Sequence, residues 1–180
     1  MEKLQQYEFE LKSICPLKMD KWVDGKQPKN EEGYKKQAEL KLYKNEKGYI
    51  SIPASAVKAA MRYASSEVGQ KREAKKNRTT IQSAVFIEPE MLSIGKKNHD
   101  GIVEDIVTRG KGEKVTRVKT FRPLIKEWKI KGIINSFGVP QEFIKECIEL
   151  AGFRYGLLSH RPEFGRFILT KFEKLDGEKE

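Results

Sequence analysis

Cationic side chains gather in two short runs of the sequence. Residues 71–78 contain five Lys or Arg against one Glu, and residues 109–122 contain six Lys or Arg against one Glu. The whole chain has 36 Lys and Arg, 26 Asp and Glu, and a formal charge of +10, so these runs hold nearly all of the surplus. Cations packed this densely displace counterions from a polyanion, which predicts nucleic acid as the partner. The candidate phosphate-binding residues are Lys71, Arg72, Lys75, Lys76, Arg78, Arg109 and Lys111.

The second run continues into a segment that mixes cations with an aromatic ring. Arg117, Lys119 and Phe121 alternate with other residues, so they share one face of a strand. A ring on such a face can stack on a nucleobase while the neighbouring cations hold phosphates. The alternative is a strand whose charged face is simply solvated.

A further candidate site lies at residues 48–62, where a strand is expected to turn into a helix. Ser55 and its small neighbours leave room for a phosphate at the start of the helix, where free N–H groups and the helix dipole favour anions. Lys58 and Arg62 follow four residues apart, so they lie one turn above each other on the helix. The alternative is an ordinary helix start with two solvated cations.

The segment at residues 156–167 is a loop with glycines near both ends, which permit positive φ angles or close approach of another backbone. We expect the end of this loop to lie beside Lys58 and Arg62 and to complete a single backbone-binding site. The alternative is a plain connection between a helix and a strand. The loop adds four candidate binding residues: His160, Arg161, Gly165 and Arg166.

Residues suited to catalysis or metal binding are sparse. His160 could act as a general base, but no partner for it is recognisable, and a donor role beside arginines is favoured. Two Cys and two His in the whole chain are too few for a thiolate or histidine metal site. We therefore predict no catalytic residue, no metal and no cofactor, and interpret Cys15 and Cys147 as core residues.

The elements that must position these residues follow an α+β order. Tyr7, Phe9 and Leu11 alternate with charged residues, which predicts a strand, and apolar residues at helical spacing predict two helices. The order of strand, helix, strand, strand, helix, strand predicts a ferredoxin-like (RRM-like) antiparallel sheet with both helices on one face and the other face free for a ligand. The expected strands are 4–14, 79–94, 115–121 with a continuation at 128–134, and 166–174; the expected helices are 53–68 and 140–151.

Several segments lack this periodicity. We expect all of them except the small hairpin named below to be irregular, and we expect residues 1–175 to form a single domain, since domains usually have about 100–200 residues. These segments are insertions at about 15–37 and 95–114, a small hairpin formed by 38–43 and 49–52, a mobile loop at 71–78, and a frayed tail at 176–180.

Membrane association is not expected. No stretch approaches the roughly 18 apolar residues of a membrane-spanning helix. The first residues also lack the apolar core of a signal peptide. We therefore predict a cytoplasmic protein without a membrane partner.

Two of these segments resemble motifs of the repeat-associated, mostly RNA-binding (RAMP) superfamily of CRISPR effectors. Residues 49–62 resemble its strand-to-helix signature: Ile52, Pro53, Ser55, Lys58 and Arg62 fit, while Ala54 and Ala59 replace two family glycines. Residues 156–167 resemble its C-terminal glycine-rich loop, in which Phe164, Gly165 and Arg166 match the Phe-Gly-Arg core. By position, residues 95–114 resemble the β-hairpin thumb of the backbone subunits.

The resemblance implies a non-catalytic protein that binds the backbone of single-stranded, crRNA-like RNA in a CRISPR-type ribonucleoprotein. Partners would be RNA or another nucleic acid, further copies along the RNA, or other effector subunits. Some family members cleave RNA through an aspartate between the first strand and the first helix, and Asp20 and Asp24 lie in a comparable region without a matching motif. The alternatives are a metal-independent or divalent-ion-dependent ribonuclease of this fold, and a virus-encoded protein that mimics or blocks such complexes.

Overall fold

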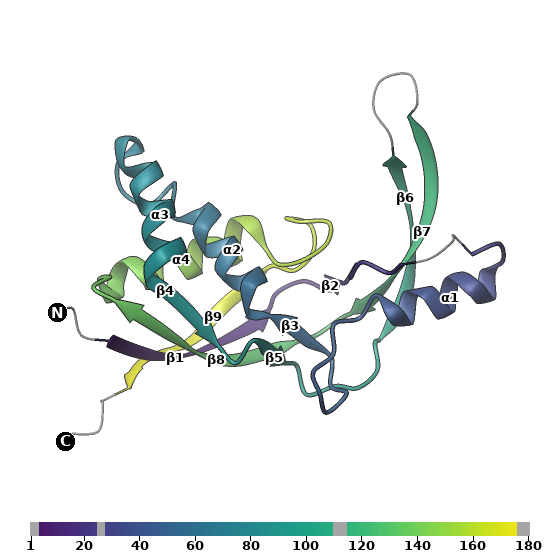
Figure 1. Ribbon diagram of the computed structural model, residues 1–180, viewed down its shortest axis with the longest axis horizontal. Helices are drawn as coiled ribbons and strands as arrows, with labels where there is room; N and C mark the ends of the chain where they lie inside the picture. The colour runs from purple at the N-terminus through teal and green to yellow at the C-terminus, as the bar shows by residue number, and fades with distance from the viewer. Residues whose placement is uncertain (1–3, 25–27, 110–114, 176–180) are drawn as a thin grey trace.

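A four-stranded antiparallel sheet forms the centre of the molecule, in the order β4-β8-β1-β9. The computed structural model describes residues 4–24, 28–109 and 115–175 (Figure 1). β1 (Leu4–Ser13) pairs along its length with β8 (Lys129–Phe137) on one side and with β9 (Phe167–Leu175) on the other, and β4 (Val85–Glu88) pairs with β8. The first and last strands are therefore neighbours, which confirms the ferredoxin-like strand order.

Two amphipathic helices, α2 (Ala54–Ala64) and α4 (Gln141–Leu150), cover one face of this sheet (Figure 1). The alternation in β1 turns its apolar side chains toward the helices, where they are buried. The predicted α+β fold class, with both helices on one face, is thus confirmed. The helix-facing core includes Tyr7, Phe9 and Leu11 from β1, Val57, Ala60, Met61 and Ala64 from α2, and Ile144, Cys147 and Ile148 from α4.

A long β-hairpin projects from the end of the molecule that lies away from α2 and α4 (Figure 1). It consists of β6 (Gly101–Arg109) and β7 (Thr116–Ile125), which pair in register from Gly101↔Leu124 to Arg109↔Thr116, and the short β2 (Leu17–Lys18) adds to β7. A second small pairing joins β3 (Ser51–Pro53) to β5 (Met91–Ser93). Of this hairpin, only β6 falls within residues 95–114, for which the resemblance implied a hairpin; β7 lies beyond them.

The expectation that residues 15–37 are irregular is wrong, because they contain β2 and most of α1 (Glu31–Leu40). Asn30 caps this helix by accepting a hydrogen bond from the N–H of Gly33 (2.9 Å). Only Ala38 of the helix is buried, so its sequence lacks the apolar stripe that reveals a helix. The strand expected at 38–43 does not form, because α1 extends to Leu40 and Lys41 caps it. Of the expected hairpin, a single bridge between Lys44 and Ile50 is present.

The basic segment 71–78 is helical, not a mobile loop. It forms a short 3-10 turn, η1 (Lys71–Glu73), and the start of α3 (Ala74–Ala84). The side chains and backbones of Gln70 and Glu73 cap each other at its start. The strand expected at 79–94 therefore begins only at Val85 and is divided into β4 and β5.

The strand expected at 115–121 and its continuation expected at 128–134 are two strands in two different sheets. β7 belongs to the hairpin, β8 belongs to the central sheet, and residues 126–128 turn between them. α4 continues into a π-helical turn, η3 (Ala151–Tyr155), which ends at Gly156. The tail expected at 176–180 lies outside the described residues. In the described part of the chain, no helix has both the length and the apolar character needed to cross a membrane.

Candidate nucleic-acid interface

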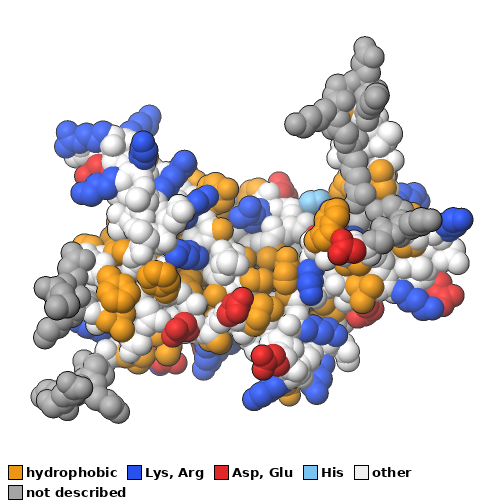
Figure 2. Space-filling view, viewed as in Figure 1, with side chains coloured by type: hydrophobic (Ala, Val, Ile, Leu, Met, Phe, Trp, Pro, Cys, Tyr) orange, Lys and Arg blue, Asp and Glu red, His pale blue; other side chains and the backbone are white. Residues whose placement is uncertain are grey.

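The densest group of cations lies on η1 and α3, at one end of the helical layer. Lys71, Arg72, Lys75 and Lys76 are exposed, and within the described residues none of them has an ion pair or a side-chain hydrogen bond. The next cation, Arg78, donates from Nη2 to Ser66 Oγ (3.1 Å). Figure 2 shows the resulting blue patch over α3. Four unpaired cations on one short helical segment are free to bind phosphate groups.

The cations of α2 are tied to their neighbours. Arg62 donates from Nη1 to Gln82 Oε1 of α3 (3.2 Å), which joins the two helices. Lys58 lies half-buried with its Nζ 4.6 Å from the ring centroid of Phe86, a cation–π arrangement, and burial lowers the pKa of its ammonium group. Ser55 is exposed in the first turn of α2.

The small residue at the start of α2 serves packing. Ala54 is buried, and its N–H donates to the carbonyl of Glu90 (2.8 Å) in the turn between β4 and β5. The chain itself therefore occupies one of the N–H groups that the sequence suggested for a phosphate. The side chain of Ser55 faces outward from the same turn and remains a candidate contact.

Gly165 also serves the fold directly. Its φ is +78°, and a Cβ added there would lie 2.1 Å from the carbonyl oxygen of Leu157. Its N–H donates to the carbonyl of Pro16 (2.8 Å), while its own carbonyl accepts from the N–H of Leu157 (3.0 Å). We therefore correct our interpretation of this glycine: the backbone that approaches it closely belongs to its own chain.

The loop reaches α2 through Arg161, not through Arg166. The N–H of Arg166 donates to Cys15 Sγ (3.2 Å), and among the described residues no contact joins Arg166 to Lys58 or Arg62. Arg161 Cζ instead lies 5.9 Å from the ring centroid of Tyr63 on α2, and Arg62 Cζ lies 5.6 Å from the same centroid. The expected meeting of the loop with this helix thus takes place at Tyr63, a residue that we did not single out from the sequence.

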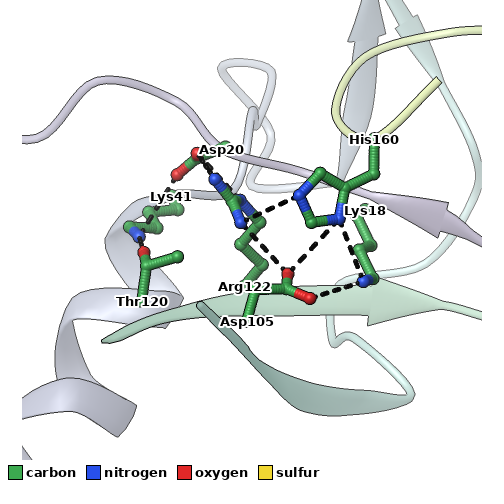
Figure 3. Close-up of polar contacts among 7 residues, drawn as sticks. All are labelled: Lys18, Asp20, Lys41, Asp105, Thr120, Arg122 and His160. Atoms are coloured by element: carbon green, nitrogen blue, oxygen red, sulfur yellow. Dashed lines mark hydrogen bonds and ion pairs between the residues drawn. The ribbon is translucent and has the colours of Figure 1, made fainter. Parts of the chain in front are cut away.

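A cluster of charged side chains fixes the foot of the hairpin (Figure 3). Arg122 of β7 donates to Asp20 (2.6 and 2.8 Å) and to Asp105 of β6 (3.1 Å). Lys18 of β2 donates to Asp105 (2.9 Å), and Lys41 contacts Asp20 (3.2 Å). All three cations are buried. Although burial alone would raise the pKa of Asp105, hydrogen bonds from Lys18 and Arg122 hold that pKa below its ordinary value.

The same cluster engages the residues that we considered for catalysis. His160 packs against it from the glycine-bounded loop, with Nδ1 3.6 Å from Asp105 Oδ2 and Nε2 3.4 Å from Arg122 Nη1. Asp20 is paired with Arg122 and Lys41, and Asp24 accepts from Trp22 Nε1 (2.8 Å). These groups therefore hold the hairpin, β2 and the loop together. Within the described residues, no group of His, Cys, Asp and Glu is arranged to hold a metal ion.

The cations of the hairpin are only partly free. Lys119 pairs with Glu104 across the strands (2.8 Å), which raises the pKa of its ammonium group. The ring of Phe121 stacks on Tyr34 of α1 at a centroid distance of 5.0 Å, so one of its faces is already covered. Arg117 is exposed on the same strand. Arg109 ends β6, the placement of its side chain is not described, and Lys111 lies outside the described residues.

The face of the central sheet away from the helices is balanced in charge. Glu10 of β1 pairs with Lys129 (2.8 Å) and Lys131 (3.3 Å) of β8, while Lys171 of β9 pairs with Glu8 and with Glu173 (3.2 Å). The hydrogen bond from Lys129 is the main reason that the pKa of Glu10 falls to about 2. These pairs offset most of the charge on this face, so it offers a polyanion few unpaired cations.

The central sheet, its two covering helices and the projecting hairpin define the class of the protein: it has an α+β ferredoxin-like fold with a hairpin extension. A chain in the cryo-EM structure of the type III-B Cmr-beta bound to cognate target RNA has a similar structure, with a TM-score of 0.57 and 13% sequence identity. The likeness covers 97% of this chain and 61% of that one, so our chain spans about three fifths of its length. The two chains therefore share a fold.

A second solved structure, that of Cmr6 from Pyrococcus furiosus, matches over 93% of this chain and 99% of its own, with a TM-score of 0.48 and 13% identity. No protein-family model and no curated protein sequence matches the chain.

Proposed function

We propose that this protein binds single-stranded RNA through the cations of η1 and α3, as a subunit of a CRISPR-type ribonucleoprotein. The observation that carries the proposal is the set of four exposed, unpaired cations on this helical segment: Lys71, Arg72, Lys75 and Lys76. Lys71 and Lys75, like Arg72 and Lys76, are four residues apart and lie about one helical turn above each other. Side chains so placed can contact successive phosphates of one strand, and they read charge rather than base identity.

Two further observations support a backbone-binding role. The sheet face that RNA-recognition modules use for base stacking here carries mostly paired charges, which favours the cations of η1 and α3 as the binding surface. The fold is also shared with a chain of a complex that was solved bound to target RNA. We propose further copies of the chain or other effector subunits as its protein partners.

Binding without cleavage is the role that the side chains favour. Asp20 lies between two cations, and the imidazole of His160 lies between Lys18 and Arg122, so both side chains already have partners within the protein. Asp24 accepts a hydrogen bond from Trp22 and, among the described residues, belongs to no group that could hold a metal ion.

The test is RNA binding by fluorescence anisotropy over a series of salt concentrations. We expect Lys71→Ala, Arg72→Ala, Lys75→Ala and Lys76→Ala, combined in one variant, to weaken binding. If each cation neutralises one phosphate, the slope of log affinity against log salt should fall by up to about 3, since each phosphate contributes ~0.7 for a single strand. An unchanged slope would assign these cations to solubility alone.

The matched control removes the same number of charges from lysines that already have carboxylate partners: Lys35, Lys36, Lys129 and Lys131. It should bind nearly as well as the wild type. Labelled RNA incubated with magnesium or with EDTA and then resolved on a gel tests the absence of cleavage. If RNA fragments appear in either condition, the protein is a ribonuclease of this fold and our proposal of binding without cleavage is wrong.

A further inference from the structure

A surface hollow of about 400 Å³ lies where the glycine-bounded loop meets α2. It is lined by Tyr63, Arg154, Tyr155, Arg161 and Pro162. Tyr63 is 40% exposed, an unusual position for a ring on the helical layer of the core. The ring of Tyr155 lies nearly parallel to it, with a centroid distance of 6.1 Å and an interplanar angle of 20°. The hollow therefore offers an aromatic surface that is supported by its neighbour and open to solvent.

The walls of this hollow are held in place by one carboxylate. Glu67, which follows α2, accepts a hydrogen bond from the hydroxyl group of Tyr155 and pairs with Arg154. These contacts, with the bond from Tyr155 as the largest cause, lower the pKa of Glu67 and keep it charged. Because both oxygens of Glu67 are engaged, the ring of Tyr155 and the guanidinium group of Arg154 are fixed before any ligand arrives.

Three guanidinium groups lie at or beside this hollow. Arg62 and Arg161 lie within 6 Å of its centroid, at 5.6 and 5.9 Å, and Arg154 completes the wall. Two hydrogen bonds connect this end of α2 to α3: Arg62 donates to Gln82, and Arg78 donates to Ser66. A flat ring next to guanidinium groups suits a ligand that combines a π-face with negative charge on either side of it.

We propose that this hollow receives one unstacked nucleobase of the bound RNA, stacked on Tyr63, with the flanking phosphates at Arg154 and Arg161. The inference rests on the proposed function and adds a base-binding subsite to it. The subsite takes any base, because every base has a π-face and the acceptor oxygens of Glu67 are already occupied. The RNA should therefore bind with little dependence on its sequence.

The test compares two oligonucleotides of equal length and charge, a uridine oligomer and its abasic ribose-phosphate counterpart, by fluorescence anisotropy. Tyr63→Ala should weaken binding of the uridine oligomer by about fivefold to a hundredfold, the range that base–aromatic stacking contributes. On the abasic oligomer, which has nothing to stack, the same change should have less than about a twofold effect. Tyr63→Phe keeps the ring and should bind both oligomers like the wild type.

The outcomes separate this inference from the proposed function. If Tyr63→Ala weakens both oligomers equally, the hollow binds phosphate only and the base-binding subsite is wrong. If Tyr63→Ala binds like the wild type while the four-cation variant binds weakly, the subsite is wrong and the proposed function stands; a protein-contact role for the hollow then replaces it. If the wild type binds neither oligomer, both proposals fail. Thermal melts verify folding, and Ala is well tolerated at an exposed helix position.

Discussion

The buried charges at the foot of the hairpin make a strong prediction about stability. Asp105 is the only carboxylate bound to Lys18 in the described structure, and their side chains are 12% and 4% exposed. Asp105→Asn keeps the shape of the side chain but leaves the ammonium group of Lys18 buried without a counter-charge. Breaking a buried pair in this way costs ~3–5 kcal/mol. We expect the lower end, about 3 kcal/mol, because Arg122 keeps its bonds to Asp20.

The expected loss should appear as a fall of roughly 6–12 °C in the melting temperature, since 1 kcal/mol shifts a domain of this size by about 2–4 °C. An exposed pair supplies the control: Glu31→Gln, which breaks the pair with Lys35 on α1, should leave the melting temperature almost unchanged. Replacing Lys18 with Met in the Asp105→Asn background should restore part of the loss, because no unpaired charge then remains buried.

The pH dependence of the stability difference between the wild type and Asp105→Asn can refute this reasoning. The pKa of Asp105 is lowered in the folded protein, so its stabilisation is fully present above the unfolded value of about 3.9 and is lost as the pH falls through the folded value. Urea unfolding followed by circular dichroism should therefore show the wild type and Asp105→Asn converging in acid. A variant as stable as the wild type at pH 7, or a difference that persists undiminished in acid, would show that the pair does not hold the hairpin.

Three further changes can be checked on the same protein. Gly165→Val should lower the melting temperature by several degrees, because its Cβ would meet the Leu157 carbonyl oxygen, while RNA affinity of the folded fraction stays unchanged; intact stability would contradict this packing. Glu10→Gln should flatten the acid dependence of the urea midpoint between about pH 4.3 and 2, since the pKa of Glu10 falls to about 2 in the fold and its stabilisation is lost over that interval; equal slopes would refute it. Burial raises the pKa of Cys147 to about 12, so this thiol should react with a thiol reagent only as the protein unfolds, and rapid labelling in native buffer would count against its place in the core.

The central sheet and its two covering helices were predictable because they bury apolar faces. The alternation of apolar residues in β1 and the apolar stripes of α2 and α4 are sequence patterns that result from this burial. α1 and α3 have no apolar stripe in their sequences, because each buries a single apolar residue, Ala38 and Ile81 respectively. They depend on caps and on polar contacts with their neighbours, which periodicity does not detect.

The candidate interface was predictable where it depends on composition and not where it depends on distant contacts. The clustering of cations in residues 71–78 is a local property, and the structure leaves four of them free. Tyr63 follows Arg62 on a helix with an apolar stripe, so its sequence position suggests a core residue. The charged cluster joins Lys18 to His160 across 142 positions of the chain, and no spacing rule connects them.

The outer strands of the central sheet limit how copies of this protein can meet. β4 has only four residues and is followed by Pro89, which has no N–H to offer a further strand. β9, on the other side, carries Lys171, Glu173 and Lys174 along its length. Short or charged strand edges of this kind resist the addition of another chain by backbone pairing. Copies that assemble on one RNA should therefore not join through the edges of the central sheet, so each can be added or removed without breaking that sheet.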